Sequence, residues 1–150
     1  MHFFDTSVLV AAFDDRDRFH QSAFSVFAEN AERGAIAVHT IAETFSILTA
    51  RRGWRASHAS EILIVNTAFL EKIFLDSAEY LQTCERAEEL GVRGGAIYDA
   101  LILECARKAK AKQIWTLNAR HFLLFAPELS GVICEPQGPQ ELHLTSMVGE

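Results

Sequence analysis

The sequence predicts an α/β fold in three layers, with a short parallel sheet between two layers of helices. Short apolar runs alternate along the chain with longer stretches in which apolar residues recur every three or four positions. Such recurrence is typical of helices, and short strands that alternate with helices form a parallel sheet covered on both faces. We therefore expect a three-layer α/β/α architecture around a short central sheet.

Five apolar runs are predicted to be strands, at residues 3–4, 35–38, 72–75, 113–117 and 131–134. The first run stops at Asp5, and a second apolar segment, residues 8–13, begins the helix that follows it. Further helices are predicted around Ala23, Phe24, Phe27 and Ala31, then at 40–52, 57–70, 77–90 and 100–110.

The chain of 150 residues has the length of one domain, and we expect residues 1–135 to form it. The glycine-rich segment 91–95 is the main internal break, and it is too short to link two domains. Residues 136–150 differ in composition, with two prolines and a glycine at their start. We expect a C-terminal tail there, either disordered or packed over the domain.

Composition argues against a membrane protein and favours a cytoplasmic one. No apolar run reaches the roughly 18 residues that a membrane span requires, so we expect no membrane partner. The N-terminal apolar segment lacks a basic region and contains Asp5, which argues against a signal peptide. The cysteines Cys84, Cys105 and Cys134 are widely spaced, so we expect reduced thiols in the core.

The formal net charge of −6 argues against a general nucleic-acid binder, because such proteins usually have a basic surface. It is compatible with an enzyme whose acidic centre binds a metal ion and whose basic residues lie locally around it. The candidates for this basic surface are Arg16, Arg51, Arg52, Arg93 and Arg120, with Arg18 and Arg55 near them in the sequence. Arg51 and Arg52 have another explanation, since cations near a helix C-terminus suit its dipole.

Four polar residues could carry the chemistry, and each also has a structural explanation. Asp5 and Asn118 both follow a predicted strand and precede a helix, so either could cap that helix. Thr40 and Glu43 have the spacing of a capping box. Asp99 is harder to explain, because it lies near the start of an apolar helix, and buried acids are rare without a partner or a cation.

Taken together, the four residues predict one site. Asp5, Glu43 and Asn118 follow predicted strands at the sheet edge where α/β proteins bind ligands. Asp99 could join them from the N-terminus of its helix. Carboxylates that converge repel one another and are stabilised by a divalent cation, and ligands that are all oxygen suit Mg²⁺ or Mn²⁺.

Four segments resemble, in their order, those of the PIN-domain family and especially its VapC-type toxin ribonucleases: FFDTSVLVAAF, HTIAETFSILT, GGAIYDALILECA and IWTLNARHF. The resemblance covers residues 1–135 and implies a PIN-like fold. It implies that Asp5, Glu43 and Asp99 bind the metal, and that Asn118 stands at a fourth catalytic position that is often Asp. It also implies that three hydroxyls orient the acids or a bound water, namely those of Thr6, Ser7 and Thr116.

The resemblance further implies the activity and the partners. We expect hydrolysis of RNA phosphodiester bonds that depends on Mg²⁺ or Mn²⁺, since such an ion polarises a phosphoryl oxygen and lowers the pKa of water. No protein nucleophile is needed, and the sequence contains no G-x-S-x-G, H-E-x-x-H or phosphate-loop motif. A VapC-type toxin would form a homodimer and bind a cognate antitoxin.

Other functions are compatible with the same residues. A housekeeping PIN nuclease would act without an antitoxin, and a non-catalytic module would keep the fold without turnover. The uncharged Asn118 favours such a module, whereas the intact acids Asp5, Glu43 and Asp99 oppose it. A phosphotransferase of the haloacid-dehalogenase kind would need an Asp two residues after Asp5, where Ser7 stands.

Overall fold

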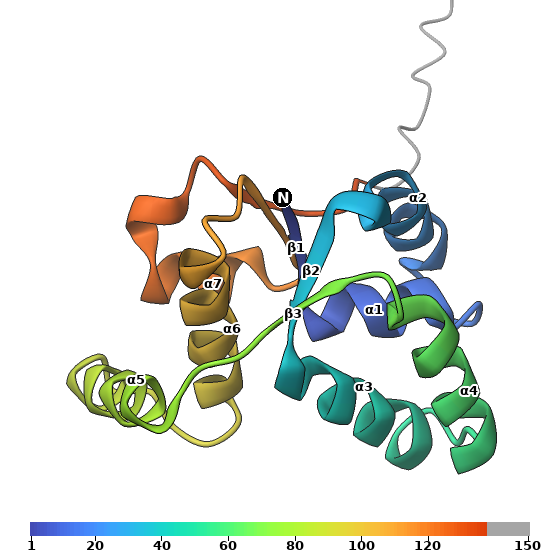
Figure 1. The fold of residues 1–150 in the computed structure, drawn as a ribbon, viewed down its shortest axis with the longest axis horizontal. Coiled ribbons are helices and arrows are strands. Elements are labelled where there is room, and N and C mark those ends of the chain that lie inside the picture. Colours follow the sequence, from blue (N-terminus) through green and yellow to red (C-terminus); the bar gives the residue numbers. More distant parts are fainter. Residues whose placement is uncertain (138–150) are drawn as a thin grey trace, which may run out of the picture.

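A five-stranded parallel sheet forms the centre of the computed structural model, which describes residues 1–137 (Figure 1). The strands are β1 (His2–Phe4), β2 (Gly34–Ala37), β3 (Glu71–Ile73), β4 (Gln113–Trp115) and β5 (Ile133–Cys134). Their order is β3-β2-β1-β4-β5, and all neighbours are parallel. The sheet grows from β1 in both directions, so the carboxyl end of β1 lies at the switch point where open α/β sheets bind ligands.

Helices cover both faces of the sheet, which confirms the predicted three-layer α/β/α architecture. Figure 1 shows α1 to α4 on one side of the strands and α5 to α7 on the other. Within the described residues these helices are α1 (Thr6–Phe13), α2 (His20–Asn30), α3 (Val38–Ala50), α4 (Ala56–Thr67), α5 (Ser77–Glu89), α6 (Ala96–Lys108) and α7 (Ala119–Phe125).

Successive strand residues contribute to two cores, one on each face, because strand side chains alternate between the faces. Phe3 packs with the α6 residue Ile102 and with Phe122 of α7, and all three side chains are fully buried. Phe4 points the other way and lies 5.3 Å, between ring centroids, from Phe27 of α2. Burial of a large apolar side chain of this kind contributes roughly 1.5–3 kcal/mol. The short strands are therefore fixed in place from both sides.

Close packing also explains the glycine at the start of β2. A Cβ atom at Gly34 would lie only 2.7 Å from carbon atoms of the Phe4 and Leu70 side chains. A larger residue would push β2 away from β1, and with it the beginning of α3.

The element boundaries and some burial patterns differ from the predicted ones. Val38, predicted to end a strand, is the first residue of α3. Phe24, one of the apolar residues whose spacing predicted α2, is 52% exposed and stacks on His20. The expectation of core thiols holds for Cys105 only, since Cys134 is half-buried and Cys84 is exposed. Cys84 points outward because the buried residues of α5 are Thr83 and Ala87.

Two expectations concern the ends of the chain and its relation to membranes. None of the helices within residues 1–137 combines the length and apolar character needed to span a membrane. Nearly all of the predicted tail, 136–150, lies outside the described residues, which end at Gln137.

Candidate active site

Asp5 is buried at the carboxyl end of β1, with 2% of its surface exposed. Two hydroxyl groups hold its carboxylate: Ser7 Oγ donates to Asp5 Oδ2 at 2.5 Å, and Thr116 Oγ1 donates to the same oxygen at 2.8 Å. Asp5 also occupies the N-cap position of α1, but its side chain makes no capping hydrogen bond. Helix capping therefore does not explain why an acid is buried here.

Glu43 lies in the second turn of α3 and contacts the first residue of α1. Thr6 Oγ1 donates to Glu43 Oε2 at 2.6 Å. The predicted capping box of Thr40 and Glu43 is wrong, because α3 starts at Val38 with Ala37 as its N-cap and no side-chain capping bond. Glu43 is instead connected, through Thr6, to the residue next to Asp5.

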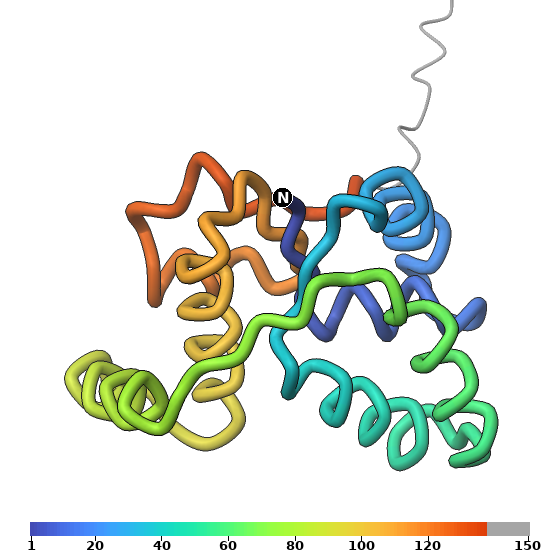
Figure 2. Tube along the Cα trace, viewed as in Figure 1, coloured from blue at the N-terminus to red at the C-terminus, as the bar shows by residue number. Residues whose placement is uncertain are grey.

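Asp99 lies in the first turn of α6, with 18% of its side chain exposed. Figure 2 shows α6 starting at the end of the molecule where β1 and β2 finish. Burial, together with the negative charges of Asp5 and Glu43, raises the pKa of Asp99 to about 7. Burial also raises the pKa of Asp5, while its two hydroxyl partners oppose this rise and Glu43 adds to it. The structure thus brings Asp5, Glu43 and Asp99 into one group, which we term the acid cluster.

The acid cluster has no lysine or arginine counterion in the described part of the chain, and its one ion-pair contact there is with His121, which is charged only when protonated. No lysine or arginine within residues 1–137 forms an ion pair with Asp5, Glu43 or Asp99. Nor, in the same residues, are three or more His, Cys, Asp or Glu side chains arranged to hold a metal ion. The donor set is nevertheless entirely carboxylate oxygen, which fits a hard divalent cation. Buried acids without a counterion are also the condition that a bound cation relieves.

The segment after β4 supports the hydroxyl groups that hold Asp5. Leu117 donates its backbone N–H to Ser7 Oγ at 2.9 Å, and Asn118 donates its own to Thr116 Oγ1 at 2.9 Å. Asn118 is the N-cap of α7, but its exposed side chain makes no capping bond. Within the described residues this side chain makes no hydrogen bond to the acid cluster, so the structure brings only the Asn118 backbone into the network.

Two histidines lie near the acid cluster, although the spacing of the histidines in the sequence indicates no ligand site and His121 is expected only on a helix surface. The Nε2 atom of His39 is buried without a hydrogen-bond partner in residues 1–137. Burial lowers the pKa of His39, while the backbone of Tyr98 and the charge of Asp5 act in the opposite direction. Its position four residues before Glu43, on the same helix face, is the sequence signal that could have revealed it. His121 is exposed on α7, with Nδ1 3.9 Å from Asp99 Oδ2.

The predicted basic surface divides into two groups. Arg16 and Arg52 form ion pairs at the C-terminal end of α1. Arg16 pairs with Asp14, and Arg52 pairs with both Asp14 and Asp17. These contacts connect the end of α1 to the end of α3, which is a structural role. The other candidates are exposed and have no acidic partner in the described residues, namely Arg51, Arg93 and Arg120.

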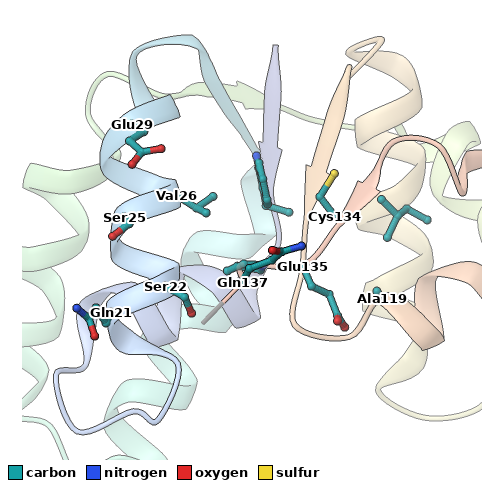
Figure 3. A pocket seen from close by; sticks show the side chains of 12 residues that line it. Gln21, Ser22, Ser25, Val26, Glu29, Ala119, Cys134, Glu135 and Gln137 are labelled. Carbon is teal, nitrogen blue, oxygen red and sulfur yellow. The ribbon is translucent and has the colours of Figure 1, made fainter. Parts of the chain in front are cut away.

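A hollow of about 1080 Å³ lies away from the acid cluster, between α2 and the edge strand β5. Figure 3 shows Ser22, Val26 and Glu29 of α2 on one side and Cys134 and Glu135 on the other. Its lining contains neither a set of converging acids nor a basic group. The candidate site residues therefore lie outside this hollow.

The sequence from residue 2 to residue 125 matches the family model described as PIN domain. The chain belongs to the PIN-domain family. It is 35% identical over 114 residues to Ribonuclease VapC40 of Mycobacterium tuberculosis, a match that covers 72% of this chain and 80% of that protein. The family resemblance inferred from the four sequence segments is thereby confirmed.

Solved structures support the PIN-type fold at lower sequence identity. VapC20 of M. tuberculosis, a toxin that cleaves the sarcin–ricin loop, superposes with a TM-score of 0.65 at 22% identity, covering 76% of this chain and 87% of its own. A toxin–antitoxin complex from Klebsiella pneumoniae gives a TM-score of 0.62 at 17% sequence identity, covering 93% of this chain and 100% of its own. VapBC2 of Rickettsia felis, bound to promoter DNA, gives a TM-score of 0.60 at 18% sequence identity, covering 89% of this chain and 97% of its own.

Proposed function

We propose that this PIN-domain protein is a metal-dependent endoribonuclease that hydrolyses RNA phosphodiester bonds and acts as the toxin of a toxin–antitoxin pair. The observation that supports the proposal is the acid cluster near the switch point of the sheet, whose three acids affect one another's charge and have no lysine or arginine partner within residues 1–137. The identity with Ribonuclease VapC40 supports the same activity.

In this proposal Asp5, Glu43 and Asp99 hold Mg²⁺ or Mn²⁺. An ion bound there supplies a Lewis acid for the phosphoryl oxygen and a water whose pKa is lowered. The hydroxyls of Ser7 and Thr116 fix the orientation of the Asp5 carboxylate. Hydrogen bonds to metal-binding carboxylates keep the ligands oriented, and their loss typically weakens metal binding.

The same network excludes water from one side of the site. Thr116 is fully buried, and Ser7 is held both by Asp5 and by the Leu117 backbone. The carboxylate of Asp5 is therefore fixed before any ion or substrate arrives, which reduces the reorganisation needed on binding. Asn118 stands beside this network with its side chain exposed, where it is available to a substrate or a water.

A non-catalytic PIN module is the second candidate, and the neutral Asn118 is the observation that favours it. A metal-activity test separates the two functions. We expect the wild-type chain to cleave single-stranded RNA with Mg²⁺, to stop when the ion is chelated, and to stop in D5N. Circular dichroism of D5N would verify that the fold is retained. Absence of cleavage by the wild type on a broad RNA pool, with Mg²⁺ and with Mn²⁺, would leave the module as the better explanation.

The RNA target can be found in cells. We expect new RNA 5′ ends at defined positions after expression of the wild-type chain, and none after expression of D5N. Growth arrest that accompanies these ends, and its rescue by a co-expressed small neighbouring gene, would distinguish a toxin from a housekeeping nuclease.

The proposed partners are a cognate antitoxin and a second copy of the chain, with the cytoplasm as the site of action. Several solved relatives are toxin–antitoxin complexes, which supports an antitoxin for this chain as well. Large apolar side chains are exposed on and after α4: Ile64 is 68% exposed, Val65 62% and Phe69 55%. Exposed apolar surface of this kind is typical of protein-binding sites. Light scattering on the isolated chain would report the dimer.

Asn118 also bears on the number of metal ions. Three ionised acids carry a charge of −3, and one Mg²⁺ leaves −1 at the site. An Asp at residue 118 would add another negative charge and favour a second ion. We propose that one ion binds firmly and that a second arrives with the substrate phosphate. Calorimetric titration should show higher affinity or stoichiometry for N118D, and an unchanged titration would contradict the proposal.

A further inference from the structure

A groove of about 600 Å³ runs along α1, from Ser7, which bonds to Asp5, to the α1–α2 loop. Ser7 and Asn118 form its near end, and Arg18 and Phe19 form its far end. Ser7 is also a hydrogen-bond partner of Asp5, so the groove and the acid cluster share a wall. The volume lies within the range of roughly 300–1,000 Å³ that is common for ligand sites.

The floor of the groove is apolar. Val10 of α1, Ile47 of α3 and Leu117 line it between the two ends. An apolar floor is unsuited to a phosphate but suits the face of a planar, weakly polar group.

The far end provides a cation on an aromatic ring. The Arg18 guanidinium lies over the Phe19 ring, 4.5 Å from its centroid. Arg18 has no acidic partner within residues 1–137, whereas the other arginine of the groove, Arg52, is held by Asp17 at 2.5 Å. Arg18 therefore supplies the free positive charge of the groove and a planar surface, since its guanidinium already stacks on Phe19.

We propose that this groove binds a nucleobase of single-stranded RNA next to the scissile phosphate, with the base stacked on the Arg18–Phe19 pair. Unpaired bases stack on aromatic rings and on guanidinium planes, and this stacking tolerates many sequences. The proposal rests on the proposed nuclease function and deepens it by assigning the path of the RNA on one side of the acid cluster.

A fluorescent base provides the direct test. The probe is a single-stranded RNA of about eight nucleotides, within the usual site size, that carries 2-aminopurine at successive positions. Ca²⁺ replaces Mg²⁺ to retain the charge balance of the site while binding is measured. We expect wild-type protein to quench the probe strongly at one position, because stacking quenches 2-aminopurine.

Three variants separate stacking from charge and from folding. R18Q should lose the quench and weaken RNA binding by roughly tenfold, within the range that loss of base stacking produces. R18K should lose the quench but keep the salt dependence, whereas R18Q should lower the salt slope by about 0.7. F19L should also lose the quench, and because Phe19 is half-buried its folding must be verified by thermal melting. Arg18 is exposed, so its variants test the proposal even where F19L unfolds.

Matched controls lie outside the lining of the groove. R33Q removes an exposed arginine from the turn before β2, and F74L shortens an exposed aromatic residue directly after β3, which also carries a cation, Lys108, over its ring. Both should bind the probe with wild-type affinity and quench. Equal affinity and quench in R18Q and R33Q would overturn the proposal, as would wild-type quench in R18K.

The outcomes distinguish this inference from the proposed function. If the wild type cleaves RNA with Mg²⁺ while R18Q binds and cleaves like R33Q, the groove assignment fails and the nuclease function stands. If the wild type neither binds nor cleaves RNA, both fail. If R18Q binds RNA normally but loses the antitoxin, the groove is a protein-binding site and the assignment to RNA is wrong.

Discussion

The two ends of α1 each bury an aspartate, and the two aspartates have opposite electrostatics. Asp5 at the N-terminal end and Asp14 at the C-terminal end are 2% and 1% exposed. The helix dipole favours an acid at the N-terminus and disfavours one at the C-terminus. Yet the pKa of Asp5 is raised and that of Asp14 is lowered. The helix dipole therefore does not decide either value.

The difference comes from the partners. Burial alone would raise the pKa of Asp14, but the hydrogen bonds and charge of Arg16 and the charge of Arg52 outweigh it. Asp5 has only neutral donors, the hydroxyls of Ser7 and Thr116 and the backbone of Ser7, and the charged neighbour that affects its pKa is the acid Glu43. A buried acid that carries its own cation is part of the fold, whereas the buried Asp5 has neutral donors only. This contrast is the reason why we propose the metal site at the Asp5 end of α1.

The largest expected effect is on catalysis, and it separates the two ends. D5N should lower Mg²⁺-dependent RNA cleavage by at least about a hundredfold, because loss of even a hydrogen-bond partner of a metal ligand typically costs 10- to 100-fold. D14N should cleave at the wild-type rate per folded molecule. Initial rates on one RNA substrate, corrected for the folded fraction, measure both. Equal loss of activity in the two variants would contradict the contrast between the two ends.

For the free energy of unfolding, D14N should have the larger effect and D5N the smaller one. D14N should lower the free energy of unfolding by roughly 2–3 kcal/mol, below the value for a wholly buried pair because Arg16 is 61% exposed. D5N should not destabilise the metal-free protein, because an uncharged amide removes a buried charge that has no counterion. Urea unfolding in the presence of a chelator measures both variants. A metal-free D5N that is less stable than D14N would show that Asp5 is mainly structural.

Asp99 of the acid cluster and Asp14 should also change the stability with pH in opposite directions. The pKa of Asp99 is about 7 in the folded state and 3.8 when unfolded, so the folded state binds more protons between these values. Stability of the metal-free protein should therefore fall as pH rises from about 4 to about 7, by roughly 4 kcal/mol at most at about 1.4 kcal/mol per pH unit. The lowered pKa of Asp14 acts in reverse, and its stabilisation is lost in acid below about 4.

Mg²⁺ provides the control for this pH effect, because a cation at the acid cluster favours the ionised acids. Saturating Mg²⁺ should remove most of the loss near pH 7, and D99N should remove the part of it that Asp99 causes, without Mg²⁺. Unfolding free energies measured across the pH range, with and without the ion, test this. A loss of stability that is the same in D99N and in wild type would exclude Asp99 as its cause.

Much of the fold was predictable because its determinants are local. The spacing of apolar residues predicted five strands and the main helices. It also predicted that Asp5 lies at the end of a strand and that Asp99 lies near the start of a helix. Capping was less predictable. Asp76 and Glu79 form a true capping box at the exposed start of α5, whereas Thr40 and Glu43 have the same spacing and form none. The difference is tertiary, because the β2 strand leads directly into α3 at Val38, two residues before Thr40.

Of the candidate site, only the acids Asp5, Glu43 and Asp99 could be predicted from the sequence, whereas the roles of the arginines and of His39 could not. The distinction between Arg18, which is free, and Arg52, which is paired, depends on contacts between residues 35 positions apart in the sequence. Sequence composition treats both as equivalent basic residues. The environment of His39 likewise depends on its contact with Tyr98, a residue of α6 that is distant in the sequence, which no local pattern encodes.

The smallest expected effect concerns the hydroxyls that make the Asp5 end different. T116V removes the donor to Asp5 Oδ2 and the acceptor for the Asn118 N–H while keeping the side-chain shape. Mg²⁺ affinity should fall 10- to 100-fold, about the loss typical for a hydrogen-bond partner of a metal ligand. T83V is the matched control, because Thr83 is also buried but its hydroxyl bonds only within α5, to the Glu79 carbonyl. Calorimetry that finds equal Mg²⁺ affinity in T116V and T83V would show that the hydroxyls do not prepare Asp5 for the ion, and the contrast between the two ends of α1 would then depend on charge alone.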